Sequence, residues 1–381
     1  MPQLPISDEY FNRSARVVAN TPRYDRLVHY RVFARRSGIL SGINRSVAFV
    51  TDQCVGPLRI HARRDGDRFN AFEAVMVIEG LFGELVNLET TYLGMLAFTG
   101  AATNMAEIVD AADGVPIIDM AARHYPWEII EQTAYAAAVA GAAGTSTRAG
   151  HAYVHKWFGT GDGTHIRINT KEPSEFRLYG SIPHALNAVY GGSSVDSAVA
   201  YQQKLPELPL TMLIDFEGRE LDACRDAYRR FGDQLYAVRL DTPGNRIHQG
   251  GTDQADSKLV DQVLANAPDR DLAQEALDQC GFGPGVTIQA AFNVRQALDA
   301  VGGRATKLVV SSGFNAKKVA AFIAAGAPID AIGTGSWVDF LVFTSDIAKV
   351  MDEGQWVPRS KAGRQNEVTL PDRLPLVVNQ S

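Results

Sequence analysis

The chain has few cysteines, no excess of positive charge and no long apolar run. Its three cysteines, Cys54, Cys224 and Cys280, lie far apart and form no C-x-x-C pair, so a zinc site is poorly supported and reduced thiols are expected. Lys and Arg number 37 against 43 Asp and Glu, and the resulting net charge of −6 disfavours nucleic acid as the main partner. No apolar run approaches the roughly 20 residues that span a bilayer, and no signal peptide is apparent. We therefore expect a cytoplasmic protein with no membrane partner.

What the chain does contain is a ladder of short apolar strands, each ending in polar residues. With 381 residues, 46% of them hydrophobic, it is long enough for two domains. Strands that alternate with helices are typical of a buried parallel sheet. An α/β barrel builds its active site from polar residues at one end of such strands, so an enzyme is favoured. The expected strands are 116–120, 178–181, 211–215, 235–241, 308–313 and 329–335.

The fold class that this pattern predicts is α/β, an incomplete α/β barrel with a strand-rich α+β N-terminal domain. We expect the N-terminal domain to span 1–115 and the barrel 116–344, with the tail 345–381 returning to the first domain. The N-terminal strands are expected at 46–50, 58–62, 74–78 and 83–88, and a tail strand at 374–378. Helices are expected at 89–112, 126–143, 220–231, 255–265, 271–279, 293–301 and 315–325.

Two neighbouring strands end in glycine-containing turns that suit a phosphate. Gly313 follows Ser312 and precedes an expected helix, and Gly333 with Thr334 repeats the arrangement one strand later. Glycine permits a tight turn, and a helix N-terminus presents free N–H groups and the positive end of its dipole. Either turn alone fits an ordinary connection between strand and helix. The two in succession favour a phosphate site.

Other strand ends carry charged groups whose roles the residues alone leave open. Arg239 and Asp241 suit an anion and a ribose hydroxyl, or else a mutual ion pair at the barrel rim. His184 suits an acid, a base or a nucleophile, but also a rim residue without chemical function. Arg123 beside an aromatic ring suits an aromatic acid or a surface turn. The segment 144–148 suits an anion or a helix N-cap.

In this order, the motifs resemble those of the nicotinate phosphoribosyltransferases. That family shares the type II phosphoribosyltransferase fold with the nicotinamide and quinolinate enzymes. The resemblance runs from Ser7 to about Lys361, and each matching segment is short, but their order and their placement at strand ends make the set specific. The segments are 7–11, 89–90, 120–123, 144–146, 180–186, 239–243, 312–313 and 333–334.

The resemblance implies a reaction in which nicotinate attacks C1 of phosphoribosyl pyrophosphate, giving nicotinate mononucleotide and pyrophosphate for NAD biosynthesis. It implies Mg²⁺ on the pyrophosphate as cofactor, without identifying metal ligands, and ATP as a co-substrate coupled through a phosphorylated histidine at the position of His184. The catalytic residues are then His184, Asp215 and Asp241. The base would contact Asp8, Tyr10, Arg123, Ser146 and Arg239. The phosphate and the ribose would contact Thr145, Ser312, Gly313, Gly333 and Thr334. Tyr10 matches an aromatic residue that stacks on the base from a neighbouring subunit, so a homodimer or higher homo-oligomer with a shared active site is implied.

Ser146 bears on the choice of base. Nicotinamide enzymes have an Asp at this position, and a carboxylate would repel the carboxylate of nicotinate, whereas a hydroxyl with Arg148 close by would not. Quinolinate carries two carboxylates and would require a more basic pocket. The segment 120–122 departs from the family pattern, which has Phe or Met and then Gly before the arginine. Transfer to quinolinate, nicotinamide or another heteroaromatic acid therefore stays an alternative, as does a catalytically silent homologue that binds phosphoribosyl ligands.

Overall fold

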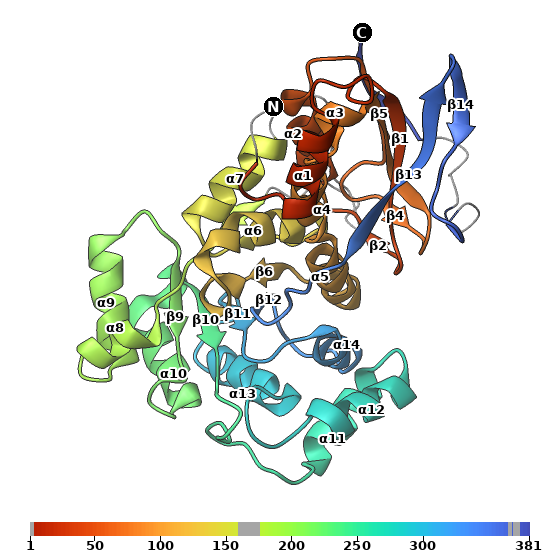
Figure 1. Cartoon of the computed structure of the whole chain (residues 1–381). Coiled ribbons are helices and arrows are strands. Elements are labelled where there is room, and N and C mark those ends of the chain that lie inside the picture. Colours follow the sequence, from red (N-terminus) through yellow and green to blue (C-terminus); the bar gives the residue numbers. More distant parts are fainter. Residues whose placement is uncertain (1–3, 159–175, 365–367, 369–373) are drawn as a thin grey trace.

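The computed structural model describes residues 4–158, 176–364, 368 and 374–381. Two large sheets organise these residues, one of seven strands and one of six, together with a two-stranded ribbon of β2 (Gly38–Ile39) and β4 (Arg68–Phe69). Figure 1 shows the six-stranded sheet at one end of the molecule and the parallel strands with their helices at the other.

The six-stranded sheet is antiparallel and combines both ends of the chain. Its order is β14-β13-β1-β5-β3-β15, so strands from the C-terminal tail flank those from the N-terminal third on both sides. The expected tail strand at 374–378 corresponds to β15, which pairs with β3. The strands are β1 (Leu27–Ala34), β3 (Leu58–Ala62), β5 (Ala74–Leu81), β13 (Phe343–Asp352), β14 (Gln355–Pro358) and β15 (Leu376–Gln380).

Two of the four strands expected in the N-terminal domain are wrong. Residues 46–50 lie inside helix α2 (Ile43–Gln53), and residues 83–88 begin in the short helix α3 (Phe82–Leu85). In α2 the buried residues are Ile43, Ser46 and Val50, a spacing of three and four that lines one face of a helix. The five-residue window was too short to separate that period from the alternation of a strand.

Helices cover the antiparallel sheet and lead into the parallel one. The expected helical region 89–112 is confirmed, but it divides into α4 (Glu89–Leu96) and α5 (Thr99–Ala111). Helix α1 (Glu9–Val18) precedes them, in a segment for which no element was predicted. Leu40, Ile60, Ile78 and Tyr92 are among the fully buried side chains that join this sheet to its helices.

The seven-stranded sheet is parallel, with the order β8-β7-β6-β12-β11-β10-β9. It confirms the predicted ladder and adds one strand, β7, that was not predicted. The edge strands β8 and β9 are not paired in the described chain, so the barrel is open. A backbone bond of 3.4 Å joins Ile182 N, beyond the end of β8, to Thr211 O in β9. The strands are β6 (Ile117–Asp119), β7 (Gly144–Thr145), β8 (Arg177–Leu178), β9 (Leu210–Leu213), β10 (Leu235–Leu240), β11 (Lys307–Val310) and β12 (Ala331–Thr334).

Helices connect these strands and cover their outer side (Figure 1). Three 3₁₀ turns, at Ala121–His124, Trp127–Ile129 and Gly232–Gln234, complete the connections. No helix in the described ranges is long and apolar enough to cross a membrane. The helices are α6 (Ile130–Val139), α7 (Arg148–Phe158), α8 (His184–Val189), α9 (Ser194–Lys204), α10 (Glu220–Phe231), α11 (Ser257–Asn266), α12 (Arg270–Cys280), α13 (Ile288–Asp299) and α14 (Ala316–Ala324).

Candidate active site

A pocket of about 680 Å³ opens on the inner side of the parallel sheet. Four of the predicted site residues, Arg123, Ser146, His184 and Arg239, line it, and each comes from a different strand end. Parallel strands bring their carboxyl ends to one edge, which is why residues so far apart in sequence meet here. Arg148, which was expected beside Ser146, is not among the lining residues. Two cations that were not predicted, Arg177 and Lys307, also line the pocket, together with the carboxylate of Asp330.

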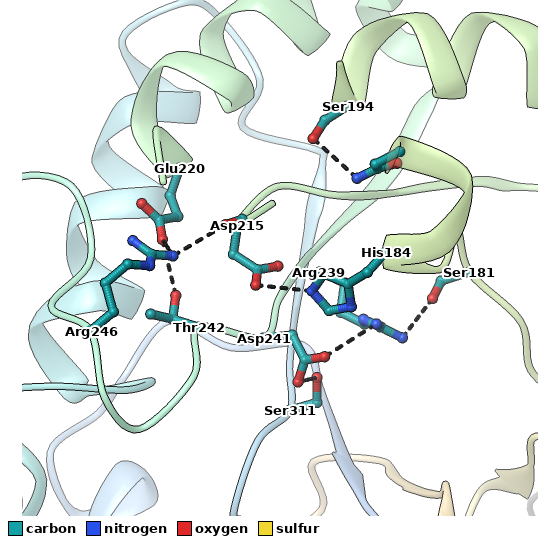
Figure 2. Close-up of polar contacts among 11 residues, drawn as sticks. Ser181, His184, Ser194, Asp215, Glu220, Arg239, Asp241, Thr242, Arg246 and Ser311 are labelled. Atoms are coloured by element: carbon teal, nitrogen blue, oxygen red, sulfur yellow. Dashed lines mark hydrogen bonds and ion pairs between the residues drawn. The ribbon is translucent and has the colours of Figure 1, made fainter. Parts of the chain in front are cut away.

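Arg239 is held in place from two sides. Its Nη1 donates to Ser181 Oγ at 2.8 Å, and its Nη2 lies 3.3 Å from Asp241 Oδ2 (Figure 2). Ser311 Oγ donates to the other oxygen of Asp241 at 2.8 Å. Burial lowers the pKa of Arg239, and the carboxylates of Asp241 and Asp215 oppose that shift. These bonds fix the guanidinium. Arg239 Nε is buried and has no acceptor in the described part of the chain, so one of its donors is unused.

His184 is paired with Asp215. His184 Nε2 lies 3.2 Å from Asp215 Oδ2, and the ring of Phe216 lies 6.2 Å from the imidazole between centroids. Burial raises the pKa of Asp215, the bond from His184 counteracts this, and the charge of Asp241 adds to the increase. The second oxygen, Asp215 Oδ1, is buried and has no partner among the described residues. A histidine oriented by a carboxylate is suited to acid–base or nucleophilic chemistry.

A polar network that the sequence did not reveal supports Asp215 from behind. Arg246 Nη2 donates to the Asp215 carbonyl at 3.1 Å and to the carboxylate of Glu220 (Figure 2). Thr242 Oγ1 and the Gln249 amide donate to the same carboxylate at 3.1 and 2.9 Å. Burial alone would raise the pKa of Glu220, but the bond from Arg246, the backbone amides and the charge of Arg246 together outweigh it and lower the pKa. The network ties the loop after β9 to the loop after β10.

The first glycine turn follows β11 and leaves its backbone amides free. Ser312 and Gly313 are both left-handed, with φ of +79° and +70°, and Asn315 caps α14 by accepting from the Lys318 amide at 3.0 Å. Within the described residues, no acceptor receives the amide of Gly313 or Asn315. A turn with free amides at a helix N-terminus is a built-in anion site.

The second glycine turn is closed by packing around Gly333, although no acceptor in the described residues receives the amides of Gly335 and Ser336. A Cβ at Gly333 would lie 2.5 Å from Met120 Sδ, and Thr334 Oγ1 donates to the Phe314 carbonyl at 2.7 Å. Thr145 is similar: its hydroxyl donates to Asp119 Oδ2 at 2.8 Å and it is buried. The hydroxyls of Thr145 and Thr334 therefore hold the rim together rather than face the pocket.

Comparisons with known proteins agree with this architecture. Residues 8–99 match the family model described as the N-terminal domain of quinolinate phosphoribosyl transferase. Nicotinate-nucleotide pyrophosphorylase from Pyrococcus furiosus superposes with a TM-score of 0.68 over 94% of this chain and 77% of its own, at 24% identity. The chain has the type II phosphoribosyltransferase fold.

Two further structures share this fold at lower identity. Human nicotinic acid phosphoribosyltransferase has a TM-score of 0.58 and 14% identity, over 93% of this chain and 76% of its own. NadC from Streptococcus pyogenes has a TM-score of 0.56 and 16% identity, over 90% of each chain. No curated protein matches the sequence.

In this type II phosphoribosyltransferase fold, two predicted base contacts lie away from the pocket of their own chain. Tyr10, on α1, is 61% exposed and does not line the pocket. Asp8 precedes the same helix, where its amide donates to Thr90 Oγ1 at 3.0 Å and its carboxylate accepts from that hydroxyl at 2.9 Å. One chain alone does not bring these residues to its own pocket.

Asp215 and Asp241 differ in their ability to hold a metal ion. No group of three or more His, Cys, Asp and Glu side chains that could hold an ion occurs in the ranges that the structure describes. Asp215 Oδ1, buried and without a partner there, is a hard oxygen ligand of the kind that Mg²⁺ prefers. Both oxygens of Asp241 are already engaged, by Ser311 and Arg239.

Proposed function

We propose that the protein is a nicotinate phosphoribosyltransferase that makes nicotinate mononucleotide and pyrophosphate from nicotinate and phosphoribosyl pyrophosphate, in NAD biosynthesis. The observation that carries the proposal is Arg239, fixed between Ser181 and Asp241 in a pocket that also holds Arg123 and Ser146. A fixed guanidinium binds a carboxylate well, and no carboxylate stands at position 146 to repel it. The name of one structural relative, human nicotinic acid phosphoribosyltransferase, points the same way.

The arrangement suggests how the reaction is assisted. Arg123 and Arg239 hold the carboxylate of the base, and the free amides after β11, at Gly313, hold the 5′-phosphate. The ribose then spans the rim between them, where Asp241 and Asp215 stabilise positive charge that develops at C1 as pyrophosphate leaves. Nicotinate is a weak nucleophile, so much of the rate enhancement must come from holding its ring nitrogen against C1.

His184 is the proposed point of ATP coupling. When His184 Nε2–H donates its hydrogen bond to Asp215, Nδ1 keeps a lone pair. That lone pair can attack the terminal phosphoryl group of ATP, releasing ADP. His184→Ala is expected to lose stimulation by ATP and to keep some basal transfer. ATP stimulation that survives the substitution would refute this role.

Mg²⁺ is the proposed cofactor, and Asp215 Oδ1 is the protein oxygen best placed to hold it. When bound, the ion would supply positive charge to the departing pyrophosphate.

We also propose a homodimer or higher homo-oligomer in which Tyr10 of one copy stacks on the base bound by another. The exposure of Tyr10 on α1 supports this, because a large aromatic ring 61% open to solvent is suited to a partner surface.

Quinolinate is the second candidate base, and one observation favours it. Arg177 and Lys307 line the same pocket as Arg123 and Arg239, so there is positive charge for a second carboxylate. The family model matched by residues 8–99 is named for quinolinate transfer.

The deciding experiment offers purified protein phosphoribosyl pyrophosphate with nicotinate, quinolinate or nicotinamide and measures pyrophosphate and nucleotide. Nicotinate is expected to give the highest kcat/KM. The matched variant Ser146→Asp should move preference from acid towards amide by about 1–3 kcal/mol, the value of one buried polar contact. Preferred use of quinolinate would establish the second candidate. Binding of phosphoribosyl pyrophosphate without turnover of any base would indicate a silent homologue.

A further inference from the structure

Lys318 lies behind the open turn and has no role in the function proposed above. It is on the first turn of α14, and its Nζ donates to the Ser312 carbonyl at 3.1 Å. The same ammonium lies 4.5 Å from the centroid of the Phe314 ring and 5.9 Å from that of Phe322. Its neighbour Lys317 is exposed and makes no such bond in the described chain.

The bond from Lys318 determines where one amide of the turn points. In a trans peptide the C=O and the N–H point in opposite directions. With the Ser312 carbonyl held by Lys318, the Gly313 N–H must point away from α14. Gly313 is exposed and nothing lies within 4 Å of a Cβ built on it, so no other described residue covers it on that side.

Thr334 does the same for another peptide of the turn. Its hydroxyl holds the Phe314 carbonyl at 2.7 Å, so the Asn315 N–H is also directed away from the atoms that anchor it. The amides of Gly313 and Asn315, which are directed in this way, lack acceptors in the described residues, as do those of Ser312 and Phe314.

The turn needs such support because of its backbone. Ser312 has φ of +79°, a left-handed conformation that costs a residue other than glycine of order 1–3 kcal/mol. A conformation of this kind persists only where its surroundings hold it, and Lys318 provides the bond to the carbonyl of the strained residue itself.

We propose that Lys318 is a positioning residue of the phosphate subsite, which holds the Ser312 carbonyl so that the turn presents its amides to a phosphorylated sugar. The inference rests on the proposed function to the extent that the ligand is a sugar phosphate. It needs neither a particular base nor ATP coupling. Lys318 acts through the Ser312–Gly313 peptide rather than by touching the ligand.

The charge of Lys318 gives a second way to observe this role. Burial lowers the pKa of Lys318, partly offset by Cys280. An anion bound at the turn stabilises the protonated ammonium, so binding is expected to weaken as pH rises through the lowered pKa of Lys318. A lysine that only filled space between helices would confer no such dependence.

The test measures ribose 5-phosphate binding by calorimetry for wild type, Lys318→Met, Lys318→Arg and the matched control Lys317→Met. Lys318→Met should bind roughly tenfold more weakly, the scale of one hydrogen bond to a charged group. Its KM for phosphoribosyl pyrophosphate should rise similarly while kcat changes little. Lys318→Arg should retain most binding and Lys317→Met should match wild type. Both Lys318 variants should lose the weakening of binding at alkaline pH, because neither Met nor Arg titrates there.

The outcomes separate this inference from the function itself. If wild type binds ribose 5-phosphate and Lys318→Met binds it equally well, the positioning role is refuted and the proposed function stands. If wild type does not bind ribose 5-phosphate, the phosphoribosyl substrate is wrong and the inference falls with it. Should Lys318→Met not fold, Lys318→Arg and the wild-type pH profile decide: loss of binding in the arginine variant together with a flat profile overturns the proposal.

Discussion

The two glycine turns look alike in sequence and differ in structure. The first follows β11, at Gly313, and the second begins within the last residues of β12, at Gly333. The first has two left-handed residues, whereas the second is packed against Met120 at Gly333 and uses Thr334 to hold the first. The pair was predicted to bind one phosphate, and in the structure Thr334 of the second turn anchors the first. A repeated motif at neighbouring strand ends need not carry a repeated role.

The largest effect should come from Asp241→Asn. Asp241 links the open turn, through Ser311, to the buried Arg239, and the amide cannot balance the charge of that guanidinium. We expect kcat/KM to fall by about 100-fold, or roughly 3 kcal/mol. Asp339→Asn, an exposed acid beyond the closed turn, is the control and should change little. Equal losses of kcat/KM in Asp241→Asn and Asp339→Asn would show that the two turns do not differ in their contribution to catalysis.

Thr334→Val should have the next largest effect. It leaves the Phe314 carbonyl without its donor, at a cost of about 2 kcal/mol of unfolding free energy, measured by urea denaturation. Ribose 5-phosphate binding should weaken as well, although Thr334 does not line the pocket. Thr334→Ser keeps the hydroxyl and should preserve both properties. A loss of stability with unchanged binding would show that the closed turn does not support the open one.

Acidification should lower the stability that the antiparallel sheet contributes without changing the stability that the contacts of the two turns contribute. In that sheet, burial lowers the pKa of His29 to about 4, helped by nearby Lys349 and Arg31. Between that value and the unfolded pKa near 6.5, the unfolded chain binds more protons, so stability falls as pH drops. Allowing for screening by water, His29 should account for about 1.5 kcal/mol of the loss from pH 7 to pH 5.

The measurement is urea unfolding of wild type and His29→Phe at both pH values, with the exposed His155→Phe as the control. His29→Phe should reduce the loss of unfolding free energy between pH 7 and pH 5, and His155→Phe should not. The destabilisation by Thr334→Val should be the same at both pH values. If that destabilisation changes with pH, the turn is coupled to a titrating group.

The smallest effects should come from the glycines themselves, and they should differ in kind. Gly313→Ala places a side chain at φ of +70° and should cost about 1 kcal/mol of unfolding free energy. Gly333→Ala instead displaces the Met120 thioether, which lines the pocket, so it should raise the KM of the base more than that of phosphoribosyl pyrophosphate. The reverse pattern would exchange the roles of the two turns.

The sequence predicted the parallel sheet better than the antiparallel one. Buried parallel strands form continuous apolar runs, which are conspicuous between helices. In contrast, β1 buries His29 and Arg31 among apolar neighbours, so its pattern does not resemble a core strand. The apolar residues around Val50 were wrongly taken for a strand because short windows do not distinguish the two periods.

The site was predictable where residue type and strand end coincide. Arg239, Asp241 and His184 satisfy that condition, but the structure was needed to show what holds them. Ser181 and Ser311 lie 58 and 70 residues from the partners they contact, and only the strand order brings them together. Glu220 and Arg246 form their network between two loops, which no local pattern indicates.

The six-stranded sheet combines both ends of the chain, which affects folding during translation. Strand β1 leaves the ribosome early, yet its partner β13 follows only after the whole barrel has been made. Until then, one edge of β1 stays unpaired, with apolar residues such as Val32 and Phe33 close to it. Closing so long a connection is slow, so the domain that starts first is completed last. A nascent chain arrested before residue 343 would carry a barrel sequence and an aggregation-prone strand edge at the same time.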